Sequence, residues 1–220
     1  MYPNFSNYYN NNYYRMQNMP NLKSYIRILH ASPNAPAVDI YANNKLIAKN
    51  LPYKKFTEYL NVAPGEYKVQ VYPAGTYNKP ILNTTIEIAP NSIYTVAAIN
   101  MLKDLQLFPI IEPHRALSPS VAFVRFGHLS PNTPNVDITL PDGKKVFKDV
   151  GYKEVTGYLP LAPGNYTLQA RPTGTNTIIL NVPNINLKPN RFYTIYAVGL
   201  LNDNPPLEVL IPLDGNTYLK

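Results

Sequence analysis

The sequence predicts an all-β protein made of two tandem copies of one domain, and three observations support this prediction. An eleven-residue motif at residues 30–40, HASPNAPAVDI, returns at residues 128–138 as HLSPNTPNVDI. The chain has 23 prolines against 10 glycines, and because average proline usage is only about 5%, this composition disfavours long helices. Apolar residues alternate with polar ones in short runs between turn signals, which is typical of half-buried strands.

The chain divides into four parts. Residues 1–22 hold many tyrosines and asparagines and few aliphatic residues. Such a segment cannot bury enough surface to offset its ordering entropy, so it is predicted to be a disordered tail. Residues 23–112 form the first repeat, residues 113–120 a proline-containing linker, and residues 121–220 the second repeat. Prolines stiffen the linker, so the two domains are expected to keep a limited range of orientations.

In the first repeat, apolar runs and turn signals predict the strands in order. Asn43-Asn44 is a tight-turn signal, and Ala63-Pro64-Gly65 and Pro73-Ala74-Gly75 bound a further strand. The predicted extended segments are residues 25–29, 38–41, 46–48, 54–62, 67–72, 86–88, 93–99 and 105–111. The second repeat has the same order, with Asp142-Gly143 in place of the paired asparagines.

The element Pro-Gly-x-Tyr occurs in both repeats and ends at Tyr67 and Tyr166. Proline and glycine make a turn. The tyrosine begins the next strand with its ring in the core and its hydroxyl near the edge, where it can bond a backbone carbonyl. This arrangement is similar to the tyrosine devices of immunoglobulin-like sandwiches, so we interpret it as part of the scaffold.

The repeated motif is predicted to be a strand, a proline-rich turn and a second strand, with a histidine and an aspartate flanking the turn. Proline suits the first central position of a type I or II turn, and the asparagine after it tolerates less common dihedral angles. If the strands are neighbours, the imidazole can donate to the carboxylate, or the carboxylate can accept turn amides. We therefore assign a structural role to His30, Ser32, Pro33, Asp39, His128, Ser130, Pro131 and Asp137.

A histidine and an aspartate can also form a metal site, or a catalytic base with the group that orients it. The chain has no cysteine, however, and its one further histidine is His114, so neither motif has an evident third ligand or nucleophile. The sequence also lacks a glycine-rich phosphate loop, a Gly-x-Ser-x-Gly element and a His-Glu-x-x-His element. It therefore predicts a protein that is not an enzyme and that binds no metal ion or cofactor.

Charge and hydropathy limit the partners and the location. The net charge is +7, but the 20 Lys and Arg residues are scattered singly or in pairs, whereas nucleic-acid binding favours a clustered stripe. The N-terminal segment lacks the basic start and the apolar core of a secretory signal, and no apolar run reaches about 18 residues. We expect synthesis in the cytoplasm without a signal peptide, no membrane span and no nucleic-acid partner.

The pattern Val/Ile-Arg-x-x-His-x-Ser-Pro-Asn-x-Pro-x-Val-Asp-Ile, with the later Pro-Gly-x-Tyr element and a late Tyr-Thr strand, resembles the bacterial DUF4397 family. The resemblance covers both repeats. It implies an immunoglobulin-like antiparallel β-sandwich for each repeat, of a kind common in secreted or cell-envelope proteins, and it implies no established catalytic residues. The Tyr/Asn-rich start resembles in composition the leaders of spore-coat proteins from spore-forming bacteria.

Two functional hypotheses follow. The first is a non-catalytic structural or interaction protein of a bacterial surface layer, such as a spore coat or exosporium. Such a protein would self-assemble or bind protein partners through its tail and its sheet edges. The second is a module that binds glycans or peptides through exposed tyrosines such as Tyr41, Tyr72 and Tyr77.

Overall fold

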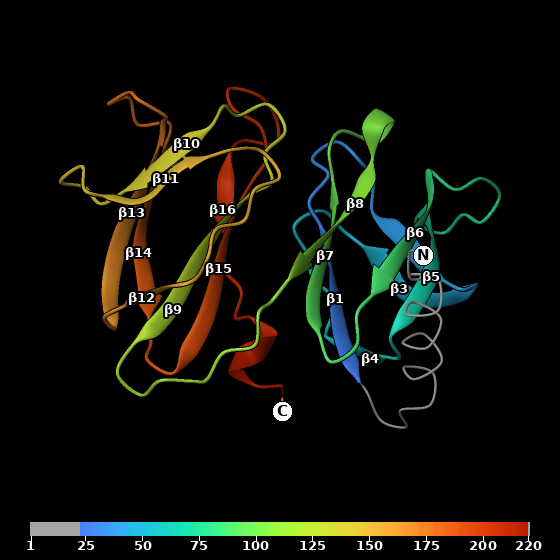
Figure 1. The fold of residues 1–220 in the computed structure, drawn as a ribbon. Coiled ribbons are helices and arrows are strands. Elements are labelled where there is room, and N and C mark those ends of the chain that lie inside the picture. The colour runs from blue at the N-terminus through green and yellow to red at the C-terminus, as the bar shows by residue number, and fades with distance from the viewer. Residues whose placement is uncertain (1–22, 220) are drawn as a thin grey trace, which may run out of the picture.

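The computed structural model describes residues 23–219 as two tandem β-sandwiches (Figure 1). The strands of the first sandwich are β1 (Ser24–His30), β2 (Val38–Ala42), β3 (Lys45–Leu51), β4 (Leu60–Val62), β5 (Gly65–Pro73), β6 (Leu82–Ile88), β7 (Ile93–Ile99) and β8 (Gln106–Ile111). The strands of the second are β9 (Ala122–His128), β10 (Val136–Thr139), β11 (Lys145–Val150), β12 (Leu159–Leu161), β13 (Gly164–Pro172), β14 (Leu180–Leu187), β15 (Arg191–Val198) and β16 (Glu208–Leu210). The predicted all-β fold class is confirmed, whereas the predicted tail, residues 1–22, lies outside the described residues.

Both sandwiches have the same strand order. An inner sheet, β4-β1-β7-β8, faces an outer sheet, β3-β2-β5-β6, in the first sandwich, and β12-β9-β15-β16 faces β11-β10-β13-β14 in the second. The prediction that the sandwiches are antiparallel is wrong for one strand pair in each inner sheet. β1 and β7 pair in parallel, and so do β9 and β15. Between β1 and β7 the chain forms the four outer strands and the inner edge strand β4, and it then enters β7 from the same end as β1; the second repeat does the same between β9 and β15.

Turn residues lie where the sequence predicted them. Asn43 and Asn44 have φ of 47° and 63°, the left-handed conformation that asparagine tolerates and that a two-residue hairpin needs. In the second repeat Gly143, with φ of 86°, takes this conformation. The hydroxyls of Tyr67 and Tyr166 each donate to the carbonyl four residues earlier, at 2.8 Å. The predicted bond between each tyrosine hydroxyl and a backbone carbonyl is therefore confirmed.

Each sandwich has its own apolar core between its two sheets. Ile28 of β1 and Val69 of β5 belong to the first core, and Phe126 of β9 and Leu168 of β13 belong to the second. Because side chains alternate along a strand, the intervening residues of β1 and β9 point away from these cores. All of them except the half-buried Tyr25 and Phe123 are buried nevertheless, so the inner sheets are covered on both faces over most of their length.

A third apolar cluster joins the two repeats and covers the second face of the inner sheets. Figure 1 shows the four sheets as successive layers, with the two inner sheets adjacent to each other. The buried members of this cluster from the first repeat are Leu29, Ala31, Ala97, Ile99 and Ile110, and those from the second repeat are Leu129, Tyr196 and Val198. The two sandwiches therefore share a buried interface in addition to the linker.

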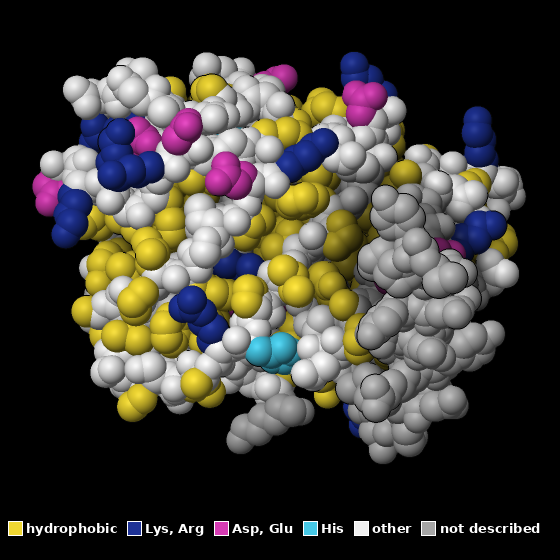
Figure 2. Space-filling view, viewed as in Figure 1, with side chains coloured by type: hydrophobic (Ala, Val, Ile, Leu, Met, Phe, Trp, Pro, Cys, Tyr) yellow, Lys and Arg dark blue, Asp and Glu magenta, His cyan; other side chains and the backbone are white. Residues whose placement is uncertain are grey.

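The described surface carries mixed charge. On the face shown in Figure 2, basic and acidic side chains are interspersed over the sandwiches. Among residues 23–219, no helix has the length and hydropathy needed to cross a membrane.

Candidate functional site

Eight polar and aromatic side chains lie at the centre of the contact between the inner sheets, and we call them the interface cluster. Each repeat supplies one arginine, one threonine, one acid and one tyrosine. The first repeat supplies Arg27, Thr95, Glu112 and Tyr59, and the second supplies Arg125, Thr194, Asp214 and Tyr158. Arg27 alternates with Ile26 and Ile28 along β1, so its side chain points away from the sandwich core and toward the other repeat.

Arg27 connects the two repeats directly. Its Nε donates to Oγ1 of Thr95 in the first repeat at 2.8 Å. In the second repeat, Nη1 donates to the carbonyl of Leu213 at 2.7 Å, and Nη2 donates to Oδ1 of Asp214 at 2.8 Å. The guanidinium carbon also lies 4.9 Å from the centre of the Tyr59 ring. These contacts use the planar fork of donors that distinguishes arginine from lysine.

Arg125 makes the equivalent contacts in the opposite direction, with one difference. Its Nε donates to Oγ1 of Thr194 at 2.7 Å, and its Nη1 donates to the carbonyl of Ile111 in the first repeat at 2.7 Å. Its Nη2, however, is buried without a hydrogen-bond partner, and its Nε lies 3.8 Å from Oδ2 of Asp214. The interface cluster is thus nearly two-fold symmetric, but only Arg27 binds a carboxylate at hydrogen-bond distance.

The two acids are held by donors from both repeats. Oε1 of Glu112 accepts hydrogen bonds from Thr95 at 2.8 Å and from Tyr59 at 2.6 Å, and Oε2 accepts the amide of Gly215 at 2.7 Å. A Cβ at Gly215 would lie 2.7 Å from Cδ1 of Leu219 and 2.9 Å from Cγ2 of Ile93, so any larger residue here would force these side chains to shift.

Asp214 has the corresponding donors in the second repeat. Its Oδ2 accepts the hydroxyl of Tyr158 at 2.6 Å and that of Thr194 at 2.5 Å, while its Oδ1 accepts from Arg27. Both carboxylates therefore have partners for their oxygens, as buried charged groups need.

The interface cluster is closed to solvent and contains two arginines and two acids. The side chains of Arg27 and Arg125 are 4% exposed, and those of Glu112 and Asp214 are fully buried. Burial raises the pKa of Glu112, and the nearby Asp214 carboxylate adds to this rise, while Arg27 opposes it. Burial alone would lower the pKa of Arg27, but the surrounding Tyr196, Tyr59 and acid groups outweigh burial and raise it. Two cations and two acids without access for a substrate form a brace between the repeats.

The histidines of the repeated motif bind backbone and not the aspartates. Nε2 of His30 lies 2.9 Å from the carbonyl of Pro36, and Nε2 of His128 lies 3.2 Å from that of Pro134. Because a carbonyl only accepts, Nε2 carries the proton in each ring. Burial lowers the pKa of both histidines. Each neutral ring therefore ties its strand to the far side of the turn, and Nδ1 is buried without a partner.

The aspartates accept backbone amides from neighbouring hairpins. Oδ1 of Asp39 accepts the amide of Asn50 at 2.7 Å, and Oδ2 accepts that of Gly75 at 2.9 Å. These two amides lower the pKa of Asp39. Of the two arrangements that the sequence left open, the structure has the carboxylate bound to amides, one from Asn50 in β3 and one from Gly75 in the turn after β5.

Asp137 repeats this arrangement and adds a charged partner. It accepts the amide of Asp149 at 2.9 Å and pairs with Nζ of Lys145 at 2.6 Å. Burial by itself would raise the pKa of Asp137, but the Lys145 ammonium and the backbone amides lower it.

The serines and prolines of the motif complete the strand-turn-strand unit from the histidine to the aspartate, which we call the corner. Oγ of Ser32 donates to the carbonyl of Asn100 at 2.6 Å, and Oγ of Ser130 donates to that of Gly199 at 2.7 Å. These bonds join the corner to the chain just beyond β7 and β15. Pro33 and Pro131 lie in turns, as predicted.

In residues 23–219, no group of three or more His, Asp or Glu side chains has a geometry that could hold a metal ion.

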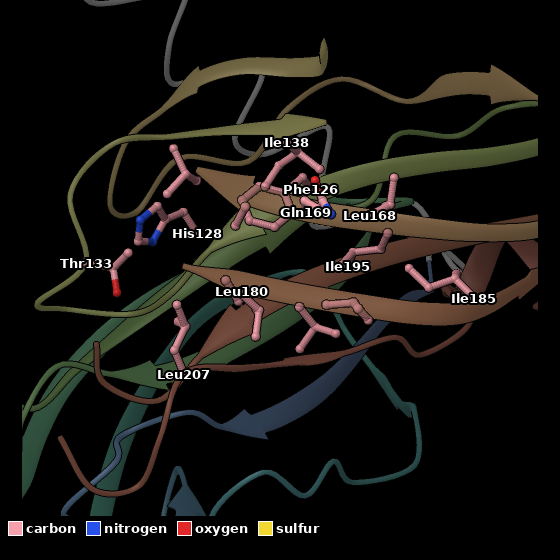
Figure 3. Close-up of a pocket in the computed structure, with 15 residues that line it drawn as sticks. Phe126, His128, Thr133, Ile138, Leu168, Gln169, Leu180, Ile185, Ile195 and Leu207 are labelled. Carbon is pink, nitrogen blue, oxygen red and sulfur yellow. The ribbon is translucent and has the colours of Figure 1, made fainter. Parts of the chain in front are cut away.

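A cavity in the second sandwich also lies beside His128. Figure 3 shows His128 and Thr133 at one end, with apolar side chains such as Phe126, Ile195 and Leu180 lining the rest. Its volume is only about 20 Å³, roughly the space that one water molecule needs and far below the several hundred Å³ of a small-molecule site. We therefore regard it as a packing defect of the core.

Tyr41, Tyr72 and Tyr77 form an aromatic cluster at the outer sheet of the first sandwich. The Tyr72 and Tyr77 rings stack with centroids 4.8 Å apart, and Tyr41 lies 5.0 Å from Tyr77. The prediction that all three are exposed is wrong for Tyr72, which is 3% exposed, and Tyr41 is half-buried, whereas Tyr77 is 55% exposed. Tyr77 belongs to the loop after β5 and stacks on the Tyr72 ring.

A family model decides the relationship of this chain to known proteins. The DUF4397 model, described as a domain of unknown function, matches residues 24–139 and 139–217. The chain belongs to the DUF4397 family. The first match covers the first sandwich together with β9 and β10 of the second, and the second match covers the remaining strands of the second sandwich. No curated protein matches the sequence.

Solved structures of low similarity also match this DUF4397 protein. The C-terminal domain of AlgF from P. aeruginosa is 21% identical, with a TM-score of 0.34, over 44% of this chain and 99% of that one. The Bacillus anthracis TIE protein is 16% identical, with a TM-score of 0.25, over 86% of this chain and 34% of that one. CBMbc, of family CBM26, from Eubacterium rectale Amy13K, solved with maltoheptaose, is 9% identical, with a TM-score of 0.26, over 86% and 96%. These likenesses are too distant to identify a function.

The interface cluster was missed by the sequence analysis, although part of its signal is visible in the repeats. Arg27 and Arg125 interrupt apolar runs at equivalent positions, and a charged residue repeated within a buried strand indicates a buried partner. Glu112 and Asp214 carried no such signal, because they follow the last strands and their chemical identity differs between the repeats.

Proposed function

We propose that this DUF4397 protein is a non-catalytic structural and interaction protein of a bacterial surface layer, such as a spore coat or exosporium. The observation that carries this proposal is the interface cluster. It joins two sandwiches through buried arginines and acids that bind one another and the backbone. The buried ionisable groups thus brace a two-domain body whose outer sheets face away from each other.

The repeated corners support the same function. His30 and His128 bind carbonyls, and Asp39 and Asp137 bind amides, so the most chemically versatile side chains of the motif satisfy backbone groups. The composition of residues 1–22 also supports assembly, because tyrosine rings stack and asparagine side chains bond in ladders when chains come together.

Two measurements test this function. A fluorescently tagged copy should localise to the surface layer of sporulating cells, and a diffuse signal in the mother cell throughout sporulation would contradict the proposal. Deletion of residues 1–22 should leave the melting temperature unchanged within about 2 °C, because the sandwiches keep their contacts, while large assemblies measured by light scattering decrease. Equal scattering with and without the tail would contradict its role in assembly.

A second candidate function, binding of glycans or peptides, is favoured by the aromatic cluster. Tyr77 presents a half-exposed ring that is fixed by stacking on Tyr72, and rigid aromatic rings are effective binding surfaces. The second repeat lacks this cluster, because Thr139 and Arg171 stand where Tyr41 and Tyr72 stand in the first.

A glycan array separates the two candidates. Binding that is lost in Tyr77→Ala and retained in Tyr218→Ala would favour recognition by the aromatic cluster, since Tyr218 is equally exposed, at 51%, but lies elsewhere. An array without any hit, or with hits unaffected by Tyr77→Ala, would remove this candidate.

A further inference from the structure

Seven of the eight sheet edges in the described residues carry a feature that discourages pairing with another strand. The edge strands β4, β12 and β16 have three residues each. Pro109 in β8 and Pro183 in β14 cannot donate a backbone hydrogen bond. The strands β3 and β11 have register irregularities, with Asn50 and Asp149 at positive φ. Natural sheets use such features to avoid joining edge to edge.

The edge strand β6 has none of these features. It has seven residues without proline, and it pairs with β5 in an unbroken register from Ile88 to Leu82. In the equivalent strand β14, Pro183 and Asn184 together face the single residue Thr167, and Asn184 has φ of 61°. The two repeats therefore differ in one respect, since the second protects this edge with a bulge and the first leaves it regular.

The sequence of β6 is complementary to itself in an antiparallel pair. The register that pairs all seven residues places Thr85 opposite its own copy and Asn83 opposite Glu87. On the outer face, these pairs contain no like charges, and an asparagine amide can donate to a carboxylate. On the inner face, Thr84 would lie opposite Ile86 of the second copy, so apolar surface at the edge of the core would be covered.

We propose that two copies of this chain associate through β6, antiparallel about a two-fold axis at Thr85, so that two outer sheets become one sheet of eight strands. The interface is isologous, and each copy contributes the same surface. The proposal deepens the proposed function by naming a surface through which copies assemble. The biological role of the dimer rests on the proposed function, whereas its formation does not.

Charge changes at Asn83 test the proposal with opposite expected signs. Asn83 is exposed and faces Gln70 within its own sheet, so either charge is tolerated by the single chain. In the pair, Asn83→Glu places two carboxylates opposite the two copies of Glu87, whereas Asn83→Lys places two ammonium groups there. Sedimentation equilibrium of the full chain at low salt should show a dimer whose Kd rises about tenfold with Asn83→Glu and falls with Asn83→Lys.

Asn181 provides the matched control. It is exposed, it occupies the equivalent place on β14, and it faces Gln169 as Asn83 faces Gln70. Asn181→Glu and Asn181→Lys should leave the dimer Kd unchanged, and circular dichroism should show that all four variants remain folded. A wild-type chain that stays monomeric at about 200 μM, or a dimer Kd that is the same for Asn83→Glu and Asn83→Lys, would overturn the proposal. Failure of the tagged protein to reach the surface layer would overturn the proposed function and leave the β6 dimer intact.

Discussion

Replacing Arg27 with methionine should destabilise the protein far more than replacing Arg125. Methionine fills much of the space of the arginine stem but removes every donor. At position 27 the change removes the bonds to Thr95, to the carbonyl of Leu213 and to the Asp214 carboxylate. Breaking a buried ion pair by removing one partner costs about 3–5 kcal/mol, because the remaining charge stays buried.

At position 125 the same change removes less. Nη2 of Arg125 has no hydrogen-bond partner, and its Nε lies 3.8 Å from Oδ2 of Asp214. A hydrogen bond to a charged group contributes about 1.5–3 kcal/mol, so Arg125→Met should cost less than Arg27→Met by about that amount.

Urea unfolding followed by far-ultraviolet circular dichroism measures both free energies of unfolding. Arg115→Met serves as the control, because Arg115 is exposed in the linker and should change the free energy by about 0.5 kcal/mol at most. If Arg125→Met lowered the free energy of unfolding as much as Arg27→Met does, the bond between Arg27 and the Asp214 carboxylate would not contribute the stability that we assign to it.

Two further predictions concern pH. Burial lowers the pKa of His30 and His128, so below about pH 6.5 the unfolded chain binds more protons than the folded chain. As the pH falls below this value, the free energy of unfolding should decrease by up to about 1.4 kcal/mol per pH unit for each histidine. Urea unfolding at pH 7.0 and 5.5 should show this loss in the wild type and in His114→Gln, and a smaller loss in a His30→Gln/His128→Gln variant; an equal loss in all three would contradict it. The lowered pKa of Asp39 makes its contribution to stability complete above about pH 4 and lost as the pH falls through its folded-state pKa. Asp39→Asn should therefore lower the melting temperature at pH 7 and lower it less at pH 3, whereas Asp104→Asn should change neither value. A deficit for Asp39→Asn that is independent of pH would refute this assignment.

Most of the fold was predictable from the sequence, because it depends on local signals. The paired asparagines at 43 and 44, the Pro-Gly-x-Tyr elements and the alternation of apolar residues placed the turns and strands. The segment 54–62 was less predictable, since only Leu60–Val62 forms a named strand. The parallel pairing of β1 with β7 was also missed, because pairing between distant strands leaves no local pattern.

The candidate site was predictable only in its residue types. The sequence indicated that the His-to-Asp corner braces the scaffold, but the partners of His30 and Asp39 are backbone groups, which have no sequence signal. The exposure of Tyr72 was predicted wrongly because the loop that carries Tyr77 folds over it. The interface cluster depends on contacts between residues up to 187 positions apart, such as Arg27 with Asp214.

Differential scanning calorimetry tests the central claim, that the interface cluster makes one body of the two repeats. The account predicts a single transition for the full chain, with a calorimetric enthalpy about equal to the van't Hoff enthalpy, because the inner sheets cannot separate without breaking the Arg27–Asp214 ion pair and exposing the shared apolar cluster. Arg27→Met should lower this one transition as a whole or split it. Two separate transitions in the wild-type protein, each with the enthalpy of one sandwich, would contradict the claim.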